Sequence, residues 1–292
     1  MKIDEEKIMK ESRDRRFLVK AKTVAGIAVN RLGLGGVSFG PTFPLSRIGL
    51  VLGTGWGDSL KPDGQREVNL KDLPGFETLG ELEGHDRCLV LGNVGNKQIL
   101  ALRGRVHLNE GHTPDIPEMV RLQTEMLLQL GVEKLIVTSA VGSLNSHVGA
   151  GDLVIVKSFL TLFAPPMPLW GGEFCSPEDA LDISLASSVS RICRNGSLHI
   201  VSHFVTHAMV RGPFFESRKI DKDILRSLGA DVVGMSMLPE ACVAALFGAK
   251  VIGLGFVTNT ASEVHSHEAN MARVKQEKEK LSLLLKNLVA EL

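Results

Sequence analysis

The chain has 292 residues, of which 44% are hydrophobic and 23% charged, a balance typical of a globular protein that buries a large core. Lys plus Arg and Asp plus Glu number 33 each, so the zero net charge gives no electrostatic case for nucleic acid or an anionic membrane as the main partner. No stretch approaches the roughly 20 consecutive apolar residues that a membrane helix needs.

Residues 1–46 are predicted to be an N-terminal extension and linker, and residues 47–292 the main domain. Residues 5–29 favour a helix, and residues 32–44 are rich in Gly, Pro and Ser. The charged start has no apolar run followed by a cleavage site, so it is not a secretory signal. The four cysteines are scattered without a Cys-x-x-Cys pair, which suggests neither a disulfide framework nor a zinc site. We therefore expect a cytoplasmic protein.

The main domain alternates predicted strands and helices, which indicates an α/β fold: a single domain with a central mixed β-sheet flanked by helices. The strands are expected at residues 48–52, 87–91, 98–102, 135–138, 153–156, 199–209, 231–233 and 251–257. The helices are expected at residues 117–130, 183–193, 218–228 and 239–247, with one amphipathic helix over residues 271–292. Residues 159–182 form a Pro/Gly-rich loop, and irregular segments of that length are usually functional or mobile.

Two segments that follow predicted strands carry candidate anion-binding groups. Residues 53–57 read Gly-Thr-Gly-Trp-Gly, and glycines after a strand let backbone N–H groups approach a phosphate. The dinucleotide-binding spacing is not matched, and no Gly-Lys-Ser/Thr follows. After the hairpin of residues 87–102, strand alternation is expected to put Arg105 and His107 on one face. Either residue alone has an ordinary interpretation, a solvated salt bridge for Arg105 and a core histidine for His107; together, beside glycines, they favour a site.

The stretch from residue 229 to residue 259 predicts a strand, a helix opened by Pro239 and closed by Gly248, and a second strand ending at Asn259. Two strands joined by a crossover helix are expected to form a parallel βαβ unit. Ligands of such sheets bind beyond the carboxyl ends of the strands. Met235, Ser236 and Asn259 all fall at those ends, which predicts that they share a site.

From about Ser46 onward the chain resembles the trimeric, low-mass purine nucleoside phosphorylase family, through motifs that occur in the family's order. These motifs are Gly53-Thr54-Gly55-x-Gly57, Leu73-Pro74-Gly75-Phe76 with Glu83-Gly84-His85, Gly104-Arg105-x-His107-x-x-Glu110-Gly111, Ala140-x-Gly142-x-Leu144-Asn145, Gly212-Pro213-x-Phe215-Glu216, Gly234-Met235-Ser236-x-x-Pro239-Glu240, Thr258-Asn259 and Ser266-His267-Glu268. The resemblance implies phosphorolysis of a purine nucleoside to free base and ribose 1-phosphate. It also implies a homotrimer that uses inorganic phosphate as co-substrate, without a metal or organic cofactor.

The same resemblance assigns roles to individual residues. The phosphate would be bound by Thr54, Arg105, His107, Ala140 and Ser236. The base would be bound by Phe215, Glu216 and Asn259, and the ribose by His112, Met235, His267 and Phe174. The catalytic residues would be Asn259, Glu216 and His107.

The chemistry of glycosidic cleavage independently calls for these residue types. The reaction leaves negative charge on the purine and an oxocarbenium-like sugar, so it needs an anion under the sugar and hydrogen-bond groups at the base. The planar fork of Arg105 suits phosphate oxygens. Glu216 can accept the N1–H of a 6-oxopurine, and the amide of Asn259 can donate to N7. Outside this context, Asn259 could equally be a strand-end cap, Phe215 a core residue and Met235 core filler.

Several alternatives stay open at this point. Ser139 and Ser143 lie in a segment that resembles 5′-methylthioadenosine phosphorylases, although those enzymes carry Asp at the position of Asn259. The absence of any Tyr, with His112 in place of a ribose-stacking Tyr, and shortened loops are compatible with a non-catalytic nucleoside-binding relative. Alternation of Glu263, His265 and His267 on one face is a weak metal-site pattern, and we predict no metal.

Overall fold

The computed structural model describes residues 15–82, 86–110, 114–165, 174–195, 198, 200–212, 220–263 and 266–292, with the backbone alone for residues 15–18, 195 and 267. The strands are β1 Ile48–Leu52, β2 Asp63–Asn69, β3 Cys88–Val94, β4 Lys97–Arg103, β5 Lys134–Ser143, β6 Leu153–Leu160, β7 Ser202–Met209, β8 Val232–Gly234 and β9 Lys250–Thr260. The α-helices are α2 Arg15–Arg31, α3 Ile116–Gln129, α4 Ile183–Asn195, α5 Ile220–Ser227, α6 Leu238–Leu246, α7 His267–Gln276 and α8 Lys278–Glu291. Short 3₁₀ turns include η1 Gly57–Ser59, η2 Leu70–Asp72, η3 Leu108–Glu110 and η5 Pro177–Ala180.

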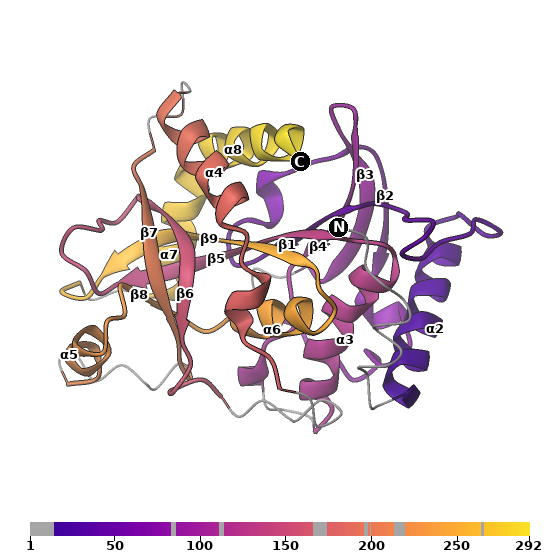
Figure 1. Cartoon of the computed structure of the whole chain (residues 1–292), viewed down its shortest axis with the longest axis horizontal. Coiled ribbons are helices and arrows are strands. Elements are labelled where there is room, and N and C mark those ends of the chain that lie inside the picture. Colours follow the sequence, from indigo (N-terminus) through magenta and orange to yellow (C-terminus); the bar gives the residue numbers. More distant parts are fainter. Residues whose placement is uncertain are drawn as a thin grey trace.

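The described strands form one mixed sheet in the order β2-β3-β4-β1-β5-β8-β7-β6-β9, with helices on both faces (Figure 1). One apolar core lies between the sheet and α2, α3 and α6, and contains Ala25, Leu122 and Val243. A second lies on the other face beneath α4 and α8, and contains Val189 and Leu285. This arrangement confirms the predicted fold class, and α2, inside the predicted extension, packs into the first core.

The predicted hairpin and most strands are confirmed, whereas β2 is absent from the sequence prediction. Its residues 63–69 are polar and mostly exposed, without the alternation that signals a half-buried strand. β2 forms because it pairs antiparallel with β3, which is a tertiary cause. Strands β5 and β9 also extend beyond the predicted limits, since each finds partners along its whole length.

The predicted C-terminal helix is two helices, so a single helix was the wrong prediction. Helix α7 ends at Gln276, and α8 begins at Lys278 after Glu277, whose φ of −95° and ψ of 8° leave the helical region. The two helices pack against different parts of the molecule. In α7, Val274 lies against Gly55 of the glycine-rich segment, while α8 fills the core on the face it shares with α4.

The expectation of a parallel βαβ unit at residues 229–259 is also wrong. β9 runs parallel to β5, but β8 runs antiparallel to β5, so the two strands joined by α6 point in opposite directions. The pairings β5–β8, β8–β7, β7–β6, β6–β9 and β9–β5 instead close a ring of five strands. The ring encloses a small apolar cluster to which each strand contributes a valine: Val141, Val154, Val205, Val232 and Val257.

No helix in the described part of the chain has the length and apolar character that a membrane crossing would require.

Candidate active site

The glycine-rich segment after β1 is joined to the carboxyl-terminal half of β5. The Gly53 N–H donates to Thr138 Oγ1 at 3.1 Å, and the Trp56 ring N–H donates to the Ser139 carbonyl at 3.1 Å. A β-carbon at Gly53 would lie 2.4 Å from the Thr138 carbonyl oxygen and 2.5 Å from Arg105 Nη2. Only glycine permits this approach, so the segment brings its backbone beside Arg105. Thr54 follows directly and is partly exposed.

Arg105 lies beyond the end of β4, so its predicted place on a strand face is wrong. β4 ends at Arg103, and the Gly104 N–H donates to the Leu52 carbonyl at 2.9 Å, which turns the chain inward. Only 1% of Arg105 is exposed. Its Nη1 donates to Glu240 Oε1 at 2.7 Å, and Nη2 donates to the Thr138 carbonyl. The ordinary interpretation, a solvated salt bridge, is therefore also incorrect, because the ion pair is buried.

His107 lies next to Arg105 and is oriented by a charged pair behind it. Glu110 Oε1 accepts from the His107 backbone N–H at 2.7 Å and lies 3.3 Å from Nδ1, while Oε2 accepts from Arg87 Nη2 at 2.6 Å. Burial would raise the pKa of Glu110, but the hydrogen bonds from His107 and the Arg87 charge lower it below its ordinary value. An ionised Glu110 favours a proton on Nδ1 of His107, which leaves Nε2 as an acceptor.

Burial also lowers the pKa of His107, an effect that the Arg105 charge reinforces and Glu110 partly opposes. His107 is therefore neutral near pH 7. The neutral ring, with Nδ1–H turned to Glu110, presents an acceptor at Nε2.

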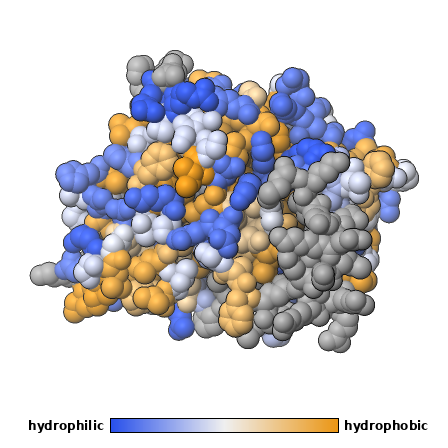
Figure 2. Space-filling model, in the orientation of Figure 1, coloured by the Kyte–Doolittle hydropathy of each residue, from blue (hydrophilic) through white to orange (hydrophobic). Residues whose placement is uncertain are grey.

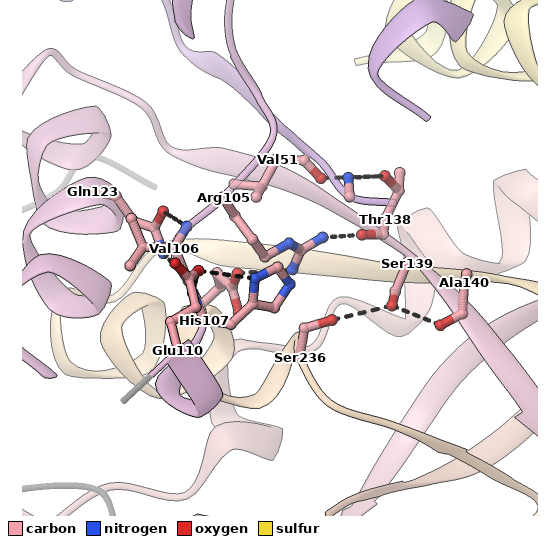
Figure 3. Close-up of polar contacts among 12 residues, drawn as sticks. Val51, Arg105, Val106, His107, Glu110, Gln123, Thr138, Ser139, Ala140 and Ser236 are labelled. Carbon is pink, nitrogen blue, oxygen red and sulfur yellow. Dashed lines mark hydrogen bonds and ion pairs between the residues drawn. The ribbon is translucent and has the colours of Figure 1, made fainter. Parts of the chain in front are cut away.

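A buried glutamine of α3 holds the segment between Arg105 and His107. Gln123 is 0% exposed; its Oε1 accepts from the Val106 N–H at 2.8 Å, and its Nε2 donates to the Val106 carbonyl at 3.0 Å. The side-chain amide thus pairs with both backbone groups of Val106, as a neighbouring strand would. Figure 3 shows this clamp beside the His107–Glu110 contact and the Arg105–Thr138 contact.

Ser236 approaches the same place from β8. Its hydroxyl lies 3.0 Å from the Ser139 hydroxyl, which donates to the Ala140 carbonyl at 2.9 Å (Figure 3). Ser236 is 7% exposed and Ser139 5% exposed. The next residue, Met237, has a φ of 76°, which is unusual for a residue with a side chain. Met237 is the N-cap of α6, so Ser236 and Glu240, the partner of Arg105, lie on either side of the point where α6 begins.

Asn259 lies near the end of β9, paired with Gly142 of β5. It is 5% exposed, and its Oδ1 accepts from the Thr258 hydroxyl at 3.0 Å. This contact orients the amide with Nδ2 beside Gly142, where an added β-carbon would lie 3.2 Å from it. Asn259 beside Gly142 and Ser236 beside Ser139 thus both lie along the carboxyl-terminal half of β5, with β8 antiparallel to β5.

The described part of the chain covers only some of the remaining predicted site residues. Met235 is partly exposed and covers Gly212, where an added β-carbon would clash with its sulfur. Phe174 is 89% exposed. The predicted residues His112, Phe215 and Glu216 lie outside the described residues, as does the side chain of His267, whose backbone opens α7 after the N-cap Ser266. In the described part of the chain, no group of three His, Cys, Asp or Glu side chains is arranged to hold a metal ion; His265 lies outside it.

A cavity of about 910 Å³ opens beside this strand end. Ser143 and Thr260, which line it, neighbour Gly142 and Asn259 in sequence, and Lys222 and Arg226 of α5 form another wall. The cavity is large enough for a small organic ligand.

The family model of the phosphorylase superfamily matches residues 47–290 of this chain. A curated relative from Bacillus subtilis, purine nucleoside phosphorylase 1, is 33% identical over 257 residues, covering 84% of this chain and 92% of its own. A purine nucleoside phosphorylase from Mycobacterium leprae is 31% identical, covering 78% and 81% of the two chains. A solved structure of isoform 2 of the Schistosoma mansoni enzyme, in complex with cytosine and ribose-1-phosphate, superposes with a TM-score of 0.79 at 25% identity, covering 94% and 96%.

The chain belongs to the purine nucleoside phosphorylase family. The resemblance drawn from the motifs is thereby confirmed, and the chain is an enzyme of the pentosyltransferase type.

This member of the purine nucleoside phosphorylase family uses several residues to which sequence reasoning gave no role. Glu240 and Glu110 appear in the sequence prediction only as positions in the motifs. Gln123 is one of several polar residues of α3, where every residue from 119 to 129 is buried, so the sequence does not single it out. A buried amide needs hydrogen-bond partners, and the structure shows that these are the backbone groups of Val106.

A second buried histidine, His207, is expected to make the stability of the fold depend on pH. His207 of β7 is 0% exposed and lies edge-on to Phe159, with 5.8 Å between the two ring centroids. Burial, with a contribution from the Arg105 charge, lowers the pKa of His207 from 6.5 to about 4. The unfolded chain therefore binds more protons between those pH values, so stability is complete above pH 6.5 and falls as the pH drops toward 4. The limiting loss is about 3 kcal/mol.

We expect a His207→Phe variant to lose less stability than the wild type between pH 7 and pH 4.5, as measured by urea unfolding at each pH. The matched control is His203→Gln, which removes a histidine that is partly exposed beside Asp152. An identical pH dependence in wild type and His207→Phe would contradict the assignment.

Proposed function

We propose that the chain cleaves 6-oxopurine ribonucleosides, inosine and guanosine, by phosphorolysis to free base and ribose 1-phosphate. The observation that carries the proposal is convergence at the end of β5. Asn259 lies beside Gly142, the Ser236 hydroxyl touches that of Ser139, and Arg105 bonds to Thr138. Family membership supports the reaction class. The proposed base specificity rests on Asn259 with Glu216.

At the phosphate end, we assign inorganic phosphate to Thr54, Arg105, His107, the Ala140 backbone and Ser236, with no metal or organic cofactor. The Arg105 charge is already balanced by Glu240, so the site offers less net positive charge than an isolated arginine would. Hydroxyl groups and backbone N–H groups would therefore supply many of the hydrogen bonds to the phosphate. His107, with Nε2 as acceptor, would orient the P–O–H of a protonated phosphate.

At the leaving-group end, the Asn259 amide would donate to N7 while Glu216 accepts the N1–H of the base. The Thr258 hydroxyl donates to Asn259 Oδ1. The NH₂ of Asn259 is therefore the group that can face a ligand. Negative charge on the departing purine strengthens such a bond as the glycosidic bond breaks, which is the condition for rate acceleration. Phe215 would stack on the base, and His112, Met235, His267 and Phe174 would contact the ribose.

We also propose a cytoplasmic homotrimer. Apolar side chains gather at the lower left of the view in Figure 2, the region in which Figure 1 places α5. On α5, Ile220 is 67% and Ile224 44% exposed, and Leu162 after β6 is 75% exposed. A cavity of about 580 Å³ lies between Leu162 and Ile224 and reaches Gly212. Exposed apolar groups of this extent support burial against another copy of the chain.

The test is a nucleoside panel assayed with and without phosphate. We expect hypoxanthine from inosine and guanine from guanosine only when phosphate is present, with ribose 1-phosphate as co-product. Adenine release from 5′-methylthioadenosine in place of these would support the methylthioadenosine alternative, which Ser139 at the site favours. Measurable purine binding by calorimetry with no turnover on any nucleoside would support a non-catalytic relative. Either result would refute the 6-oxopurine assignment.

A further inference from the structure

Two of the four cysteines meet, although they lie 67 residues apart in the chain. Cys175 is exposed in the segment before η5, and Cys242 is buried in α6. The Cys175 thiol lies 3.5 Å from the Cys242 carbonyl oxygen. The two thiols also interact with each other, and this contact, followed by burial, raises the pKa of Cys242. Cys88 of β3 and Cys193 of α4 are buried free cysteines that lie in other parts of the fold.

We propose that Cys175 and Cys242 form a reversible disulfide by exchange with a low-molecular-weight disulfide. The site is a redox modification site outside the residues assigned to substrate.

The order of the two attacks follows from the difference in exposure between the two thiols. Cys242 retains its proton and is shielded from solvent, so the Cys175 thiolate is the group that attacks the external disulfide. A protein–reagent disulfide forms and one reagent thiolate leaves. Cys242 then loses its proton and attacks Cys175 Sγ, which releases the second reagent thiolate. The protein gives up two electrons and two protons, and the reagent disulfide is reduced to two thiols.

The surrounding structure holds the two segments together before oxidation. Lys250 Nζ donates to the Asp179 carbonyl at 3.0 Å, and Leu181 forms a bridge with Val251 of β9. These contacts fix η5 beside the start of β9, the strand that follows α6. The segment that carries Cys175 comes directly before η5, so closing the disulfide requires only local adjustment around Cys175. Disulfides need closely placed β-carbons, and prior placement favours formation of the intramolecular bond over a persistent mixed disulfide.

The disulfide would restrain α6 at its centre. Glu240 lies two positions before Cys242 and makes the buried ion pair with Arg105. Oxidation therefore joins an exposed segment to the helix that carries the partner of Arg105. Because the chemistry of the thiols is measured directly, a negative result here would leave the proposed phosphorolysis untouched, and the reverse also holds.

The experiment uses the full-length protein, reduced, freed of reductant and incubated with glutathione disulfide. We expect the four thiols titrated by Ellman's reagent in denaturant to fall to two. Dithiothreitol should restore them, and peptide mapping should join the peptides of Cys175 and Cys242. A Cys242→Ser variant should stop at a mixed disulfide with one glutathione on Cys175, whereas Cys175→Ser should resist modification.

The matched controls are Cys88→Ser and Cys193→Ser, each of which should still lose two thiols. Retention of all four thiols in the wild type, a persistent mixed disulfide, or a link through Cys88 or Cys193 would overturn the proposal. Mapping the wild-type protein decides the question even if a serine at the buried Cys242 position impairs folding.

Discussion

An Asn259→Asp enzyme is expected to lose about 10²–10³-fold in kcat on inosine, equivalent to about 2.7–4 kcal/mol of barrier. A carboxylate at this position still accepts from the Thr258 hydroxyl but cannot donate to N7. It also places a negative charge beside a departing purine that is itself becoming negative. The substitution keeps the size of the side chain, so the loss reports on the donor and not on packing. The measurement is steady-state kinetics on inosine and guanosine at saturating phosphate.

The control for the amide-to-carboxylate change is Asn30→Asp on the exposed side of α2, which should leave kcat unchanged. Should Asn259→Asp turn over inosine like the wild type, Asn259 would not be the donor to the leaving base. Relative activity toward 6-amino nucleosides is the informative second readout. A carboxylate can accept from a 6-amino group, so the ratio of adenosine to inosine turnover should rise.

Glu240→Ala is expected to destabilise the fold by about 3–5 kcal/mol, because it leaves the Arg105 charge buried without its carboxylate partner. Arg105 is 1% exposed and Glu240 also 1%, so water cannot replace the lost contact at low cost. Urea unfolding at neutral pH measures the change. A loss below about 1 kcal/mol, the range of exposed pairs, would mean that the ion pair opens to solvent.

The double variant Arg105→Met/Glu240→Leu separates structure from chemistry. Exchanging a buried ion pair for apolar residues of similar volume is often neutral or stabilising, so most of the stability should return. Phosphorolysis should not return, because phosphate has lost its guanidinium. The matched control is Arg121→Met/Glu125→Leu, which removes a second buried pair, 2.8 Å apart within α3, that has no assigned role at the site. Recovery of both stability and activity in the first double variant would exclude Arg105 from phosphate binding.

The sequence predicted the elements whose signals are local. Strand β1 was predicted with its observed limits, and α3 and α6 begin at Pro-containing turns and end near glycines, signals that depend on nearby residues alone. β2 and the direction of β8 depend on partners distant in the chain, and neither hydrophobic pattern nor turn residues encode them. The sequence places Glu277 inside a continuous amphipathic pattern, so tertiary packing, not local preference, separates α7 from α8.

The candidate site shows the same division. Motif order named Arg105, His107, Ser236 and Asn259, and the structure brings these residues to one end of β5. The pairing of Arg105 with Glu240 and the clamp of Gln123 on Val106 could not be foreseen, because each joins segments more than 15 residues apart. The burial of Arg105 followed from the turn after Gly104, which strand alternation does not describe. The positions of these side chains were thus easier to predict than the partners that orient them.

The ring of five strands has a consequence for how the molecule can associate. Because β9 pairs with β5 as well as with β6, that end of the sheet closes on itself, and in the described part of the chain the sheet terminates openly only at β2. β2 carries Asp63, Arg66 and Glu67, all exposed, and charged side chains discourage another strand from adding there. Copies of this chain are therefore expected to assemble through side-chain surfaces, and not by extending the sheet from one molecule to the next.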